Sequence, residues 1–173
     1  MRYTLTPREP AAHRLHCMLE LDRPQPGGQR LSLPAWIPGS YMIRDFARHV
    51  VEFRAHADGR SVDWSKLDKQ TWQCAPVDGP LTVEWVVHAW DPSVRAAAID
   101  DTGGFFNGTS VFLRPEGLAD GPFDLSLCPP QGPVQGHWRA VTTMPPTAVH
   151  ADGFGDYRAA DYEELTDHPV LLG

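Results

Sequence analysis

Hydrophobic and polar residues alternate along several short stretches, and the clearest stretch runs from Leu81 to Ala89. Its apolar positions are Leu81, Val83, Trp85, Val87 and Ala89. Because successive side chains of a strand point to opposite faces, this stretch predicts a strand with one face in the core. The segment His13–Leu21 shows the same alternation and predicts a second half-buried strand.

Turn-forming residues separate these runs. Pro24–Gly28 lies between His13–Leu21 and a short apolar run at Leu31–Leu33, which predicts a hairpin joined by a turn-rich loop. Val50–Ala57 is a further expected strand, and Asp58-Gly59 closes it with a strong turn signal.

Later apolar runs are short and bounded by glycine or proline. They fall at Val111–Leu113, Phe123–Leu127 and Trp138–Thr142. This rhythm of strands and turns predicts an all-β chain folded as an antiparallel β-sandwich, with at most a small additional sheet.

Helical patterns are confined to two short segments. Ile43–Val50 has room for one or two turns, and Asp161–Leu165 places a glutamate three residues after an aspartate, the capping-box spacing. Pro145–Gly155 reads as a loop that leads to this final capped turn.

The length of 173 residues and the 42% of hydrophobic residues fit one globular domain spanning residues 1–173. The net charge of −7 and the scattered Lys and Arg residues argue against a nucleic-acid partner.

Cys17, Cys74 and Cys128 are too far apart for a metal knuckle and suit small core or strand positions. The start MRYTLTPREP has no apolar signal region and no window is long enough to cross a membrane, so we expect a cytoplasmic protein. A periplasmic protein that had lost its signal peptide would show the same pattern.

Residues for catalysis or metal binding do not assemble into a motif. His13 and His16 are expected on opposite faces of one strand, so they cannot chelate one ion together. The chain has no His-Glu-x-x-His zinc motif, no Gly-x-Ser-x-Gly elbow around Ser40 and no phosphate-binding glycine pattern. We therefore assign no catalytic residue, no metal ligand and no cofactor to this chain.

The segment from Asp100 to Gly108 allows two interpretations. In the first, it is a hairpin loop whose Asp and Asn side chains accept hydrogen bonds from turn amides. In the second, its tip presents Phe106 and Asn107 to a ligand or a partner domain. The sequence leaves both open.

Five segments in this order carry a family resemblance. They are Trp36–Arg48, Lys69–Trp72, Ser93–Arg95, Gly104–Ser110 and Asp161–Val170. Together they closely resemble the N-terminal region of the glycyl aminopeptidase family, metallopeptidase family 61, and they span nearly the whole chain.

The resemblance implies a multidomain enzyme. It implies an N-terminal β-sandwich, a thermolysin-like domain whose His-Glu-x-x-His motif and downstream Glu bind zinc, and commonly a PDZ domain. Members release N-terminal Gly and Ala from peptides. By this resemblance the chain stops at Gly173, before the zinc domain and the PDZ domain, so the expected partner is its own catalytic domain and the fragment alone is not expected to be an enzyme.

In the related leukotriene-hydrolase-like aminopeptidases the N-terminal domain contributes to the end of the peptide cleft, and we expect the same here. Asn107 is expected to accept a hydrogen bond from the substrate ammonium, and Phe106 to narrow the pocket toward small side chains. An exposed apolar patch is expected to mark the face that docks on the catalytic domain.

The signature Trp36–Asp45 itself has two interpretations. In the structural one, Pro38 and Gly39 make a turn, Trp36 and Tyr41 supply buried surface, and Arg44 pairs with a carboxylate. The carboxylates considered are Asp45, Asp100 and Asp101. In the functional one, Tyr41 and Arg44 face the cleft and Arg44 meets the substrate or the catalytic domain.

Two other classes of function remain as alternatives. The chain could be an independent β-sandwich module that binds peptide or carbohydrate on a tryptophan platform. The platform residues would be Trp64, Trp72, Trp90 and Trp138. It could also be a self-contained enzyme, which peptidase activity of the purified chain with added zinc would establish.

Overall fold

A computed structural model describes residues 1–40 and 42–173 as three sheets and a few short helical turns. The large sheet has eight strands in the order β14 (Pro146–Val149), β15 (Gly155–Ala159), β12 (Phe123–Leu127), β1 (Arg2–Pro7), β2 (Arg14–Leu21), β8 (Leu81–His88), β4 (Val50–Ala57) and β5 (Arg60–Ser61). One four-stranded sheet has the order β13 (Ala140–Thr142), β16 (Val170–Leu172), β10 (Gly104–Phe106) and β9 (Ala97–Ile99). The other has the order β11 (Arg114–Pro115), β3 (Arg30–Ser32), β7 (Thr71–Cys74) and β6 (Trp64–Lys66).

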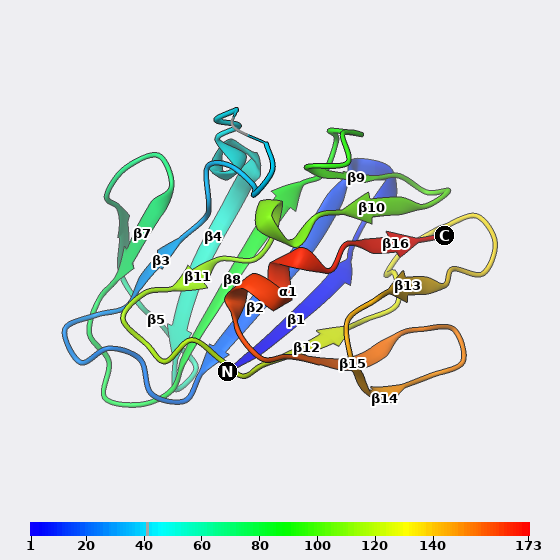
Figure 1. Ribbon diagram of the computed structural model, residues 1–173. Helices are drawn as coiled ribbons and strands as arrows, with labels where there is room; N and C mark the ends of the chain where they lie inside the picture. The colour runs from blue at the N-terminus through cyan, green and yellow to red at the C-terminus, as the bar shows by residue number, and fades with distance from the viewer. Residues whose placement is uncertain (41) are drawn as a thin grey trace.

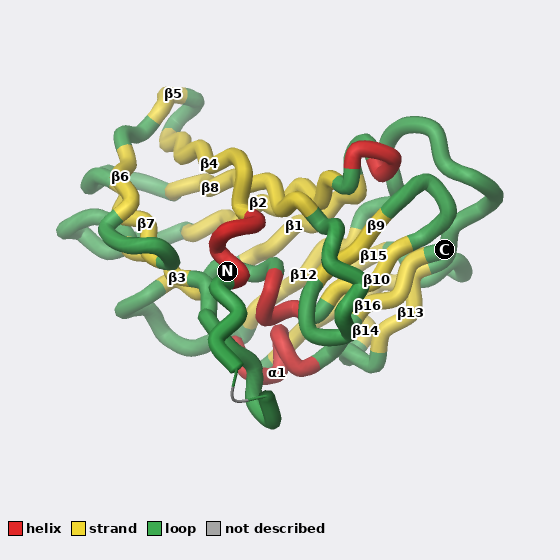
Figure 2. Tube along the Cα trace, turned by 90° about the horizontal axis from the view of Figure 1, so that it is seen from above, coloured by secondary structure: helices red, strands yellow, loops and turns green. Residues whose placement is uncertain are grey.

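Helical structure is limited to α1 (Tyr162–Asp167) and the 3-10 turns η1 (Pro10–Ala12), η2 (Phe46–His49) and η3 (Gly108–Ser110) among the described residues. The two small sheets lie on the same side of the large sheet, with α1 between them (Figures 1 and 2). This layered arrangement confirms the all-β sandwich. Both small sheets are full four-stranded sheets, which is more than the single small sheet expected.

Alternation along the central strands builds the core, because each strand turns every second side chain toward the small sheets. The inward residues of β8 are Leu81, Val83, Trp85 and Val87, and those of β2 are Leu15, Cys17, Leu19 and Leu21. All eight are almost completely buried. The strands predicted at His13–Leu21, Val50–Ala57, Leu81–Ala89 and Phe123–Leu127 are thus confirmed within a residue at each end.

The N-terminal strand β1 lies inside the large sheet. It pairs antiparallel with β2 on one side and parallel with β12 on the other, where Arg2 stands opposite Asp124. The other strand pairs of the described residues run antiparallel.

The predicted hairpin across Pro24–Gly28 is wrong. Strand β2 belongs to the large sheet, whereas β3 pairs with β7 and β11 in a small sheet. The loop therefore carries the chain from one layer to the other. A turn-rich loop between two apolar runs does not specify that the runs pair with each other.

The predicted strand at Val111–Leu113 is also wrong, although all three residues are fully buried. Their backbone carbonyls accept hydrogen bonds from buried side chains: Trp85 Nε1 to Val111 (2.9 Å), Tyr162 Oη to Phe112 (2.6 Å) and Tyr3 Oη to Leu113 (2.6 Å). Burial raises the pKa of Tyr3 and Tyr162, so both hydroxyls keep their protons and act as donors. Aromatic side chains here satisfy the backbone carbonyls that a neighbouring strand would otherwise bind.

Two further boundaries differ from the prediction. The segment Pro145–Gly155 is not a loop throughout, because it contains β14, which pairs with β15. In the segment Trp138–Thr142 the strand begins only at Ala140.

The two helical predictions hold in type and place. Ile43–Val50 contains the turn η2, and α1 follows Asp161. The Asp161 carboxylate accepts the backbone N–H of Glu164 (2.8 Å), while the Glu164 carboxylate reaches back to the N–H of Ala160. The aspartate thus caps the helix as predicted, whereas the glutamate bonds the residue before the N-cap instead of the N-cap itself.

Candidate functional site

The outward face of the sheet β13-β16-β10-β9 carries a continuous line of apolar side chains. Strand register places Val141 opposite Leu171, Leu171 opposite Phe105, and Phe105 opposite Ala98. A bridge then pairs Ala98 with Trp90. We call these five residues the apolar row.

The apolar row is open to solvent. Val141, Leu171 and Trp90 expose 62%, 57% and 59% of their surfaces. The adjacent positions of the same strands, such as Phe106 and Val170, are fully buried. Directly opposed apolar side chains on an outward sheet face therefore form a patch rather than isolated exposures.

Beside the row lies an open groove of about 610 Å³, lined in part by Trp90, Pro92, Val94, Phe105 and Leu171. Its lining is mostly apolar and also includes Asp100, Thr102 and Gly103 of the turn between β9 and β10. A groove of this kind receives apolar side chains of another molecule or domain.

A histidine holds the indole of Trp90 at the end of the row. The ring of His13 stacks on Trp90 with centroids 3.8 Å apart and planes 28° from parallel. His13 Nδ1 lies 2.6 Å from the carbonyl oxygen of Ile99, so that nitrogen carries a proton and donates. This contact fixes the Trp90 ring against β9.

The structure places Phe106 and Asn107 away from the tip of their hairpin. The tip is Asp100–Gly103, where the Asp100 carboxylate accepts the N–H groups of Thr102 (2.8 Å) and Gly103 (3.2 Å). The Thr102 hydroxyl also donates to this carboxylate (2.6 Å), and that bond first, then the bond from the Thr102 N–H, hold the pKa of Asp100 below its usual range. Asp100 therefore follows the first interpretation of this segment, in which its side chain accepts hydrogen bonds from the amides of the turn.

Phe106 lies in the core, where its ring meets Phe112 edge to face at 6.0 Å. Asn107 caps η3: its side-chain oxygen accepts the N–H of Thr109 (3.1 Å) and its own N–H donates to Ala96 (2.8 Å). Close packing requires glycine at position 108, because a Cβ on Gly108 would lie 2.8 Å from Thr166 Cα. Of these residues, Asn107 keeps a side chain near the surface.

The signature segment Trp36–Asp45 forms a loop closed at its base, where Arg44 N–H donates to the carbonyl of Ala35 (2.7 Å). At its tip, Ser40 N–H donates to Ile37 (3.1 Å) and Gly39 has a φ of 78°. This is the predicted Pro38-Gly39 turn, which needs glycine at its third position.

Two details of the structural interpretation are wrong. Trp36 exposes 49% of its surface, so it does not supply a buried anchor. Met42 and Ile43 of the same loop are exposed even more. Asp45 pairs with Lys69 (Nζ to Oδ1, 2.7 Å). Among the described residues, the Arg44 guanidinium reaches Ser40 Oγ and no carboxylate. Tyr41 lies outside the described residues.

The four tryptophans of the proposed platform do not share a surface. Trp72 and Trp138 are buried, and the exposed Trp64 belongs to β6, on the other small sheet from Trp90. Within residues 1–40 and 42–173, no three His, Cys, Asp or Glu side chains are grouped to hold a metal. The zinc implied by the resemblance thus finds no ligand set in the described part of the chain.

Comparison with known proteins decides the family. The family model described as the peptidase M61 N-terminal domain matches residues 2–173. The chain belongs to this family. The resemblance seen in the sequence is thereby confirmed, and the apolar row is a feature of an M61 N-terminal domain.

Solved structures agree with this assignment. An aminopeptidase N family protein from Idiomarina loihiensis is 39% identical, with a TM-score of 0.94 over 99% of this chain. An M1 zinc metallopeptidase from Deinococcus radiodurans, at 11% identity and a TM-score of 0.54, shares the fold over 99% of the chain. This M61 N-terminal domain spans 29% and 41% of those two proteins' chains. No curated protein sequence matches it.

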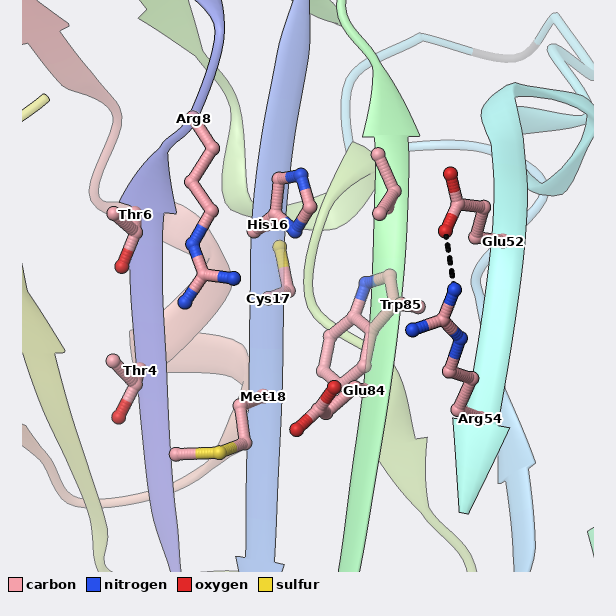
Figure 3. A pocket seen from close by; sticks show the side chains of 11 residues that line it. Thr4, Thr6, Arg8, His16, Cys17, Met18, Glu52, Arg54, Glu84 and Trp85 are labelled. Carbon is pink, nitrogen blue, oxygen red and sulfur yellow. Dashed lines mark hydrogen bonds and ion pairs between the residues drawn. The ribbon is translucent and has the colours of Figure 1, made fainter. Parts of the chain in front are cut away.

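The outer face of the large sheet in this M61 N-terminal domain is polar. Figure 3 shows side chains from β1, β2, β8 and β4 lining a shallow pocket there, among them Thr4, His16, Glu84 and Arg54. Glu52 accepts hydrogen bonds from Arg14 (3.1 Å) and Arg54 (3.3 Å).

Further along this face the Arg158 guanidinium donates to Asp124 (2.8 Å), which holds the pKa of Asp124 down. In addition, Ser126 donates to Asp156 (2.6 Å). The charged groups of this face are thus largely paired with one another, as on a surface that stays in water. No helix in the described part of the chain is long and apolar enough to cross a membrane.

Proposed function

We propose that this chain is the non-catalytic N-terminal domain of a zinc-dependent aminopeptidase that releases small N-terminal residues, Gly and Ala, from peptides. Its apolar row docks on the catalytic domain of the same polypeptide, and Asn107 helps to form the substrate pocket. Membership in the M61 N-terminal domain family supports the enzyme class. The apolar row is the observation that carries the docking role.

The row favours a domain of the same polypeptide as its occupant. The domain makes up 29% of the Idiomarina relative's chain, so the greater part of that protein lies outside it. Burying one leucine-sized side chain in an interface contributes about 1.5–3 kcal/mol, and the row offers several such side chains. An interface of this kind would be permanent and apolar rather than transient.

A matched pair of leucines tests docking in the complete polypeptide that carries this domain. Leu171 in the row and Leu67 after β6 are similarly exposed, at 57% and 51%. Leu171→Asp is expected to bury a charge at the interface, lower the thermal midpoint of the complete enzyme and reduce kcat/KM for Gly- and Ala-anilides by roughly tenfold or more. Leu67→Asp is expected to change neither.

Both variants are also made in the isolated chain, where the two leucines face water and each substitution should be tolerated equally. Equal losses from both variants in the complete enzyme would contradict docking through the row. A loss from Leu171→Asp that is as large in the isolated chain would show that the residue matters only for folding.

Asn107 supplies the proposed contact with the substrate ammonium. Its side-chain oxygen uses one acceptor site for the N–H of Thr109, and the carbonyl has a second lone pair available for an ammonium donor. Phe106 is buried and would act only by supporting the backbone that carries Asn107.

In the complete enzyme, Asn107→Ala is expected to raise KM for Gly-anilide substrates. Because this change also removes the cap of η3, Asn107→Asp is the control: it keeps a side-chain acceptor for Thr109 and for a cation. Unchanged kcat/KM in Asn107→Ala would refute the role of Asn107. A matching loss in Asn107→Asp would point to a structural effect.

A further inference from the structure

A small cavity lies between the signature loop and the segment that follows Trp90, at one end of the molecule. It has a volume of about 110 Å³ and is lined in part by Ile43, Arg44, Phe46, Arg48, His49 and Asp91. Figure 1 shows the chain before β4 and the chain between β8 and β9 both at the upper end of the sheets. One water needs only roughly 10–15 Å³, so the cavity has room for a small polyatomic group.

The charges around this cavity do not cancel. Arg44 and Arg48 bring two positive charges and Asp91 one negative charge. His49 is mainly neutral at pH 7, because burial and then the nearby Arg48 lower its pKa. The neutral ring accepts a hydrogen bond at Nε2 from Arg48 Nε (3.1 Å). The lining thus has a net charge of about +1 (two arginines against one aspartate).

Arg44 has hydrogen-bond donors that the described residues do not use. Its Nε is buried without a partner among residues 1–40 and 42–173. Its Nη2 reaches Ser40 Oγ at only 3.5 Å, the outer limit of a hydrogen bond. Because Nε has almost no accessible surface, the Nη groups are the donors that a ligand in the cavity can meet, and Nη2 has only this distant acceptor.

We propose that this cavity is a binding site for a carboxylate monoanion, which Arg44 engages through its guanidinium fork while Arg48 supplies the second positive charge. A planar carboxylate matches the two parallel N–H groups of a guanidinium. A monoanion matches the net charge of the lining, whereas the charge of a phosphate dianion would exceed it. The site rests on the cavity alone, and only its assignment to the C-terminal carboxylate of a peptide rests on the proposed function.

NMR of the 173-residue chain tests binding directly. Sodium acetate is titrated at constant ionic strength against sodium chloride while the arginine Nε–H resonances are recorded. Acetate is expected to shift the Arg44 resonance saturably, with half-saturation on the order of millimolar for so small a ligand. Chloride and acetamide are expected to produce no saturable shift.

His49 gives a second readout that survives substitution of Arg44. The charged and titratable groups that face it are Arg48, Asp91 and His88, with Arg44 across the cavity. A bound carboxylate stabilises the imidazolium, so acetate should raise the pKa of His49 in the wild type. Arg44→Gln should abolish this rise, Arg44→Lys should weaken it, and Arg60→Gln, at an exposed arginine of β5, should leave it unchanged.

Several results would overturn the proposal. A linear shift, an equal response to chloride, or a rise in the pKa of His49 that persists in Arg44→Gln would show screening instead of a site. Phosphate binding more tightly than acetate would overturn the assignment to a monoanion. Circular dichroism of Arg44→Gln separates loss of binding from loss of folding.

The carboxylate has two possible sources, and the complete polypeptide distinguishes them. If an acidic side chain of the docked domain fills the cavity, the pKa of His49 is already raised there and acetate has no further effect. If the source is the C-terminal carboxylate of a peptide, Arg44→Gln raises KM for Ala-Gly-Gly but not for its C-terminal amide. A complete polypeptide in which acetate still binds as in the isolated chain, and in which Arg44→Gln leaves both KM values unchanged, would exclude both sources, whereas a lack of acetate binding in the isolated chain would overturn the site itself.

Discussion

The apolar row and the outer face of the eight-stranded sheet are both made of side chains that strands turn away from the core. On the large sheet those positions carry groups that pair with one another, such as Arg158 with Asp124. On the sheet β13-β16-β10-β9 they carry Val141, Leu171, Phe105 and Trp90, with no charged side chain within the row. Because the same alternation generates both faces, the difference reflects what each face meets: water on one side and, as we propose, another domain on the other.

The largest expected effect comes from the inner and outer sides of a single strand, β10. Phe106→Ala should lower the free energy of unfolding by about 3–5 kcal/mol, because the fully buried ring leaves a cavity. Phe105→Ala, one residue earlier and half-buried in the row, should cost about 1 kcal/mol. Urea unfolding of the isolated chain measures both. Similar losses would mean that the row is part of the core.

An intermediate effect is expected on the polar face, at His16. Burial, and then the nearby Arg8, lower its pKa, while Glu52 raises it. The folded state therefore binds the proton more weakly than the unfolded state, whose imidazole titrates near 6.5. Stability should be highest above that pH and should decline as the pH falls through the lowered pKa of the folded state.

His16→Gln removes this contribution and should flatten the decline between about pH 6.5 and pH 5. His49 keeps its own share of the pH dependence in this variant, because its pKa is also lowered. Thermal midpoints across this range provide the measurement. Parallel pH profiles for the two proteins would show that His16 is not the group responsible.

The smallest effect on stability is expected in the row itself. Leu171→Lys in the isolated chain should change the free energy of unfolding by no more than about 0.5 kcal/mol, because the side chain faces water. The same change should reduce binding of a hydrophobic dye and self-association at high concentration. Glu84→Leu on the polar face, the converse substitution, should increase both. If Leu171→Lys left dye binding unchanged, the exposed apolar surface that binds the dye would lie outside the row.

The sequence predicted strands where the alternation of apolar and polar residues was long. It did not predict which strands pair with each other. Leu81–Ala89 shows its inward face directly because every second residue is apolar. The partners of β1 and β3 depend on contacts between segments far apart in the chain, which local patterns do not record. Val111–Leu113 looked like a strand because it is apolar, yet its carbonyls bond to Tyr3, Trp85 and Tyr162.

The sequence predicted that an exposed apolar patch exists but not which residues form it. An exposed apolar patch was expected, and the family was recognised from segments such as Gly104–Ser110. The row itself combines single residues from four very short strands and one isolated bridge. Trp36 was expected inside because tryptophan is large and apolar, but a loop closed by its own backbone hydrogen bonds does not need it as an anchor.

The position of β1 between β2 and β12 sets an order of events during synthesis. Strand β1 leaves the ribosome before both of its neighbours: it can pair with β2 soon afterwards, but its other ladder must await Phe123–Leu127. Until then the chain displays an unprotected strand edge beside Tyr3 and Leu5, whose side chains belong to the core. A nascent chain stalled before Phe123 therefore exposes an aggregation-prone strand edge that β12 covers in the folded domain.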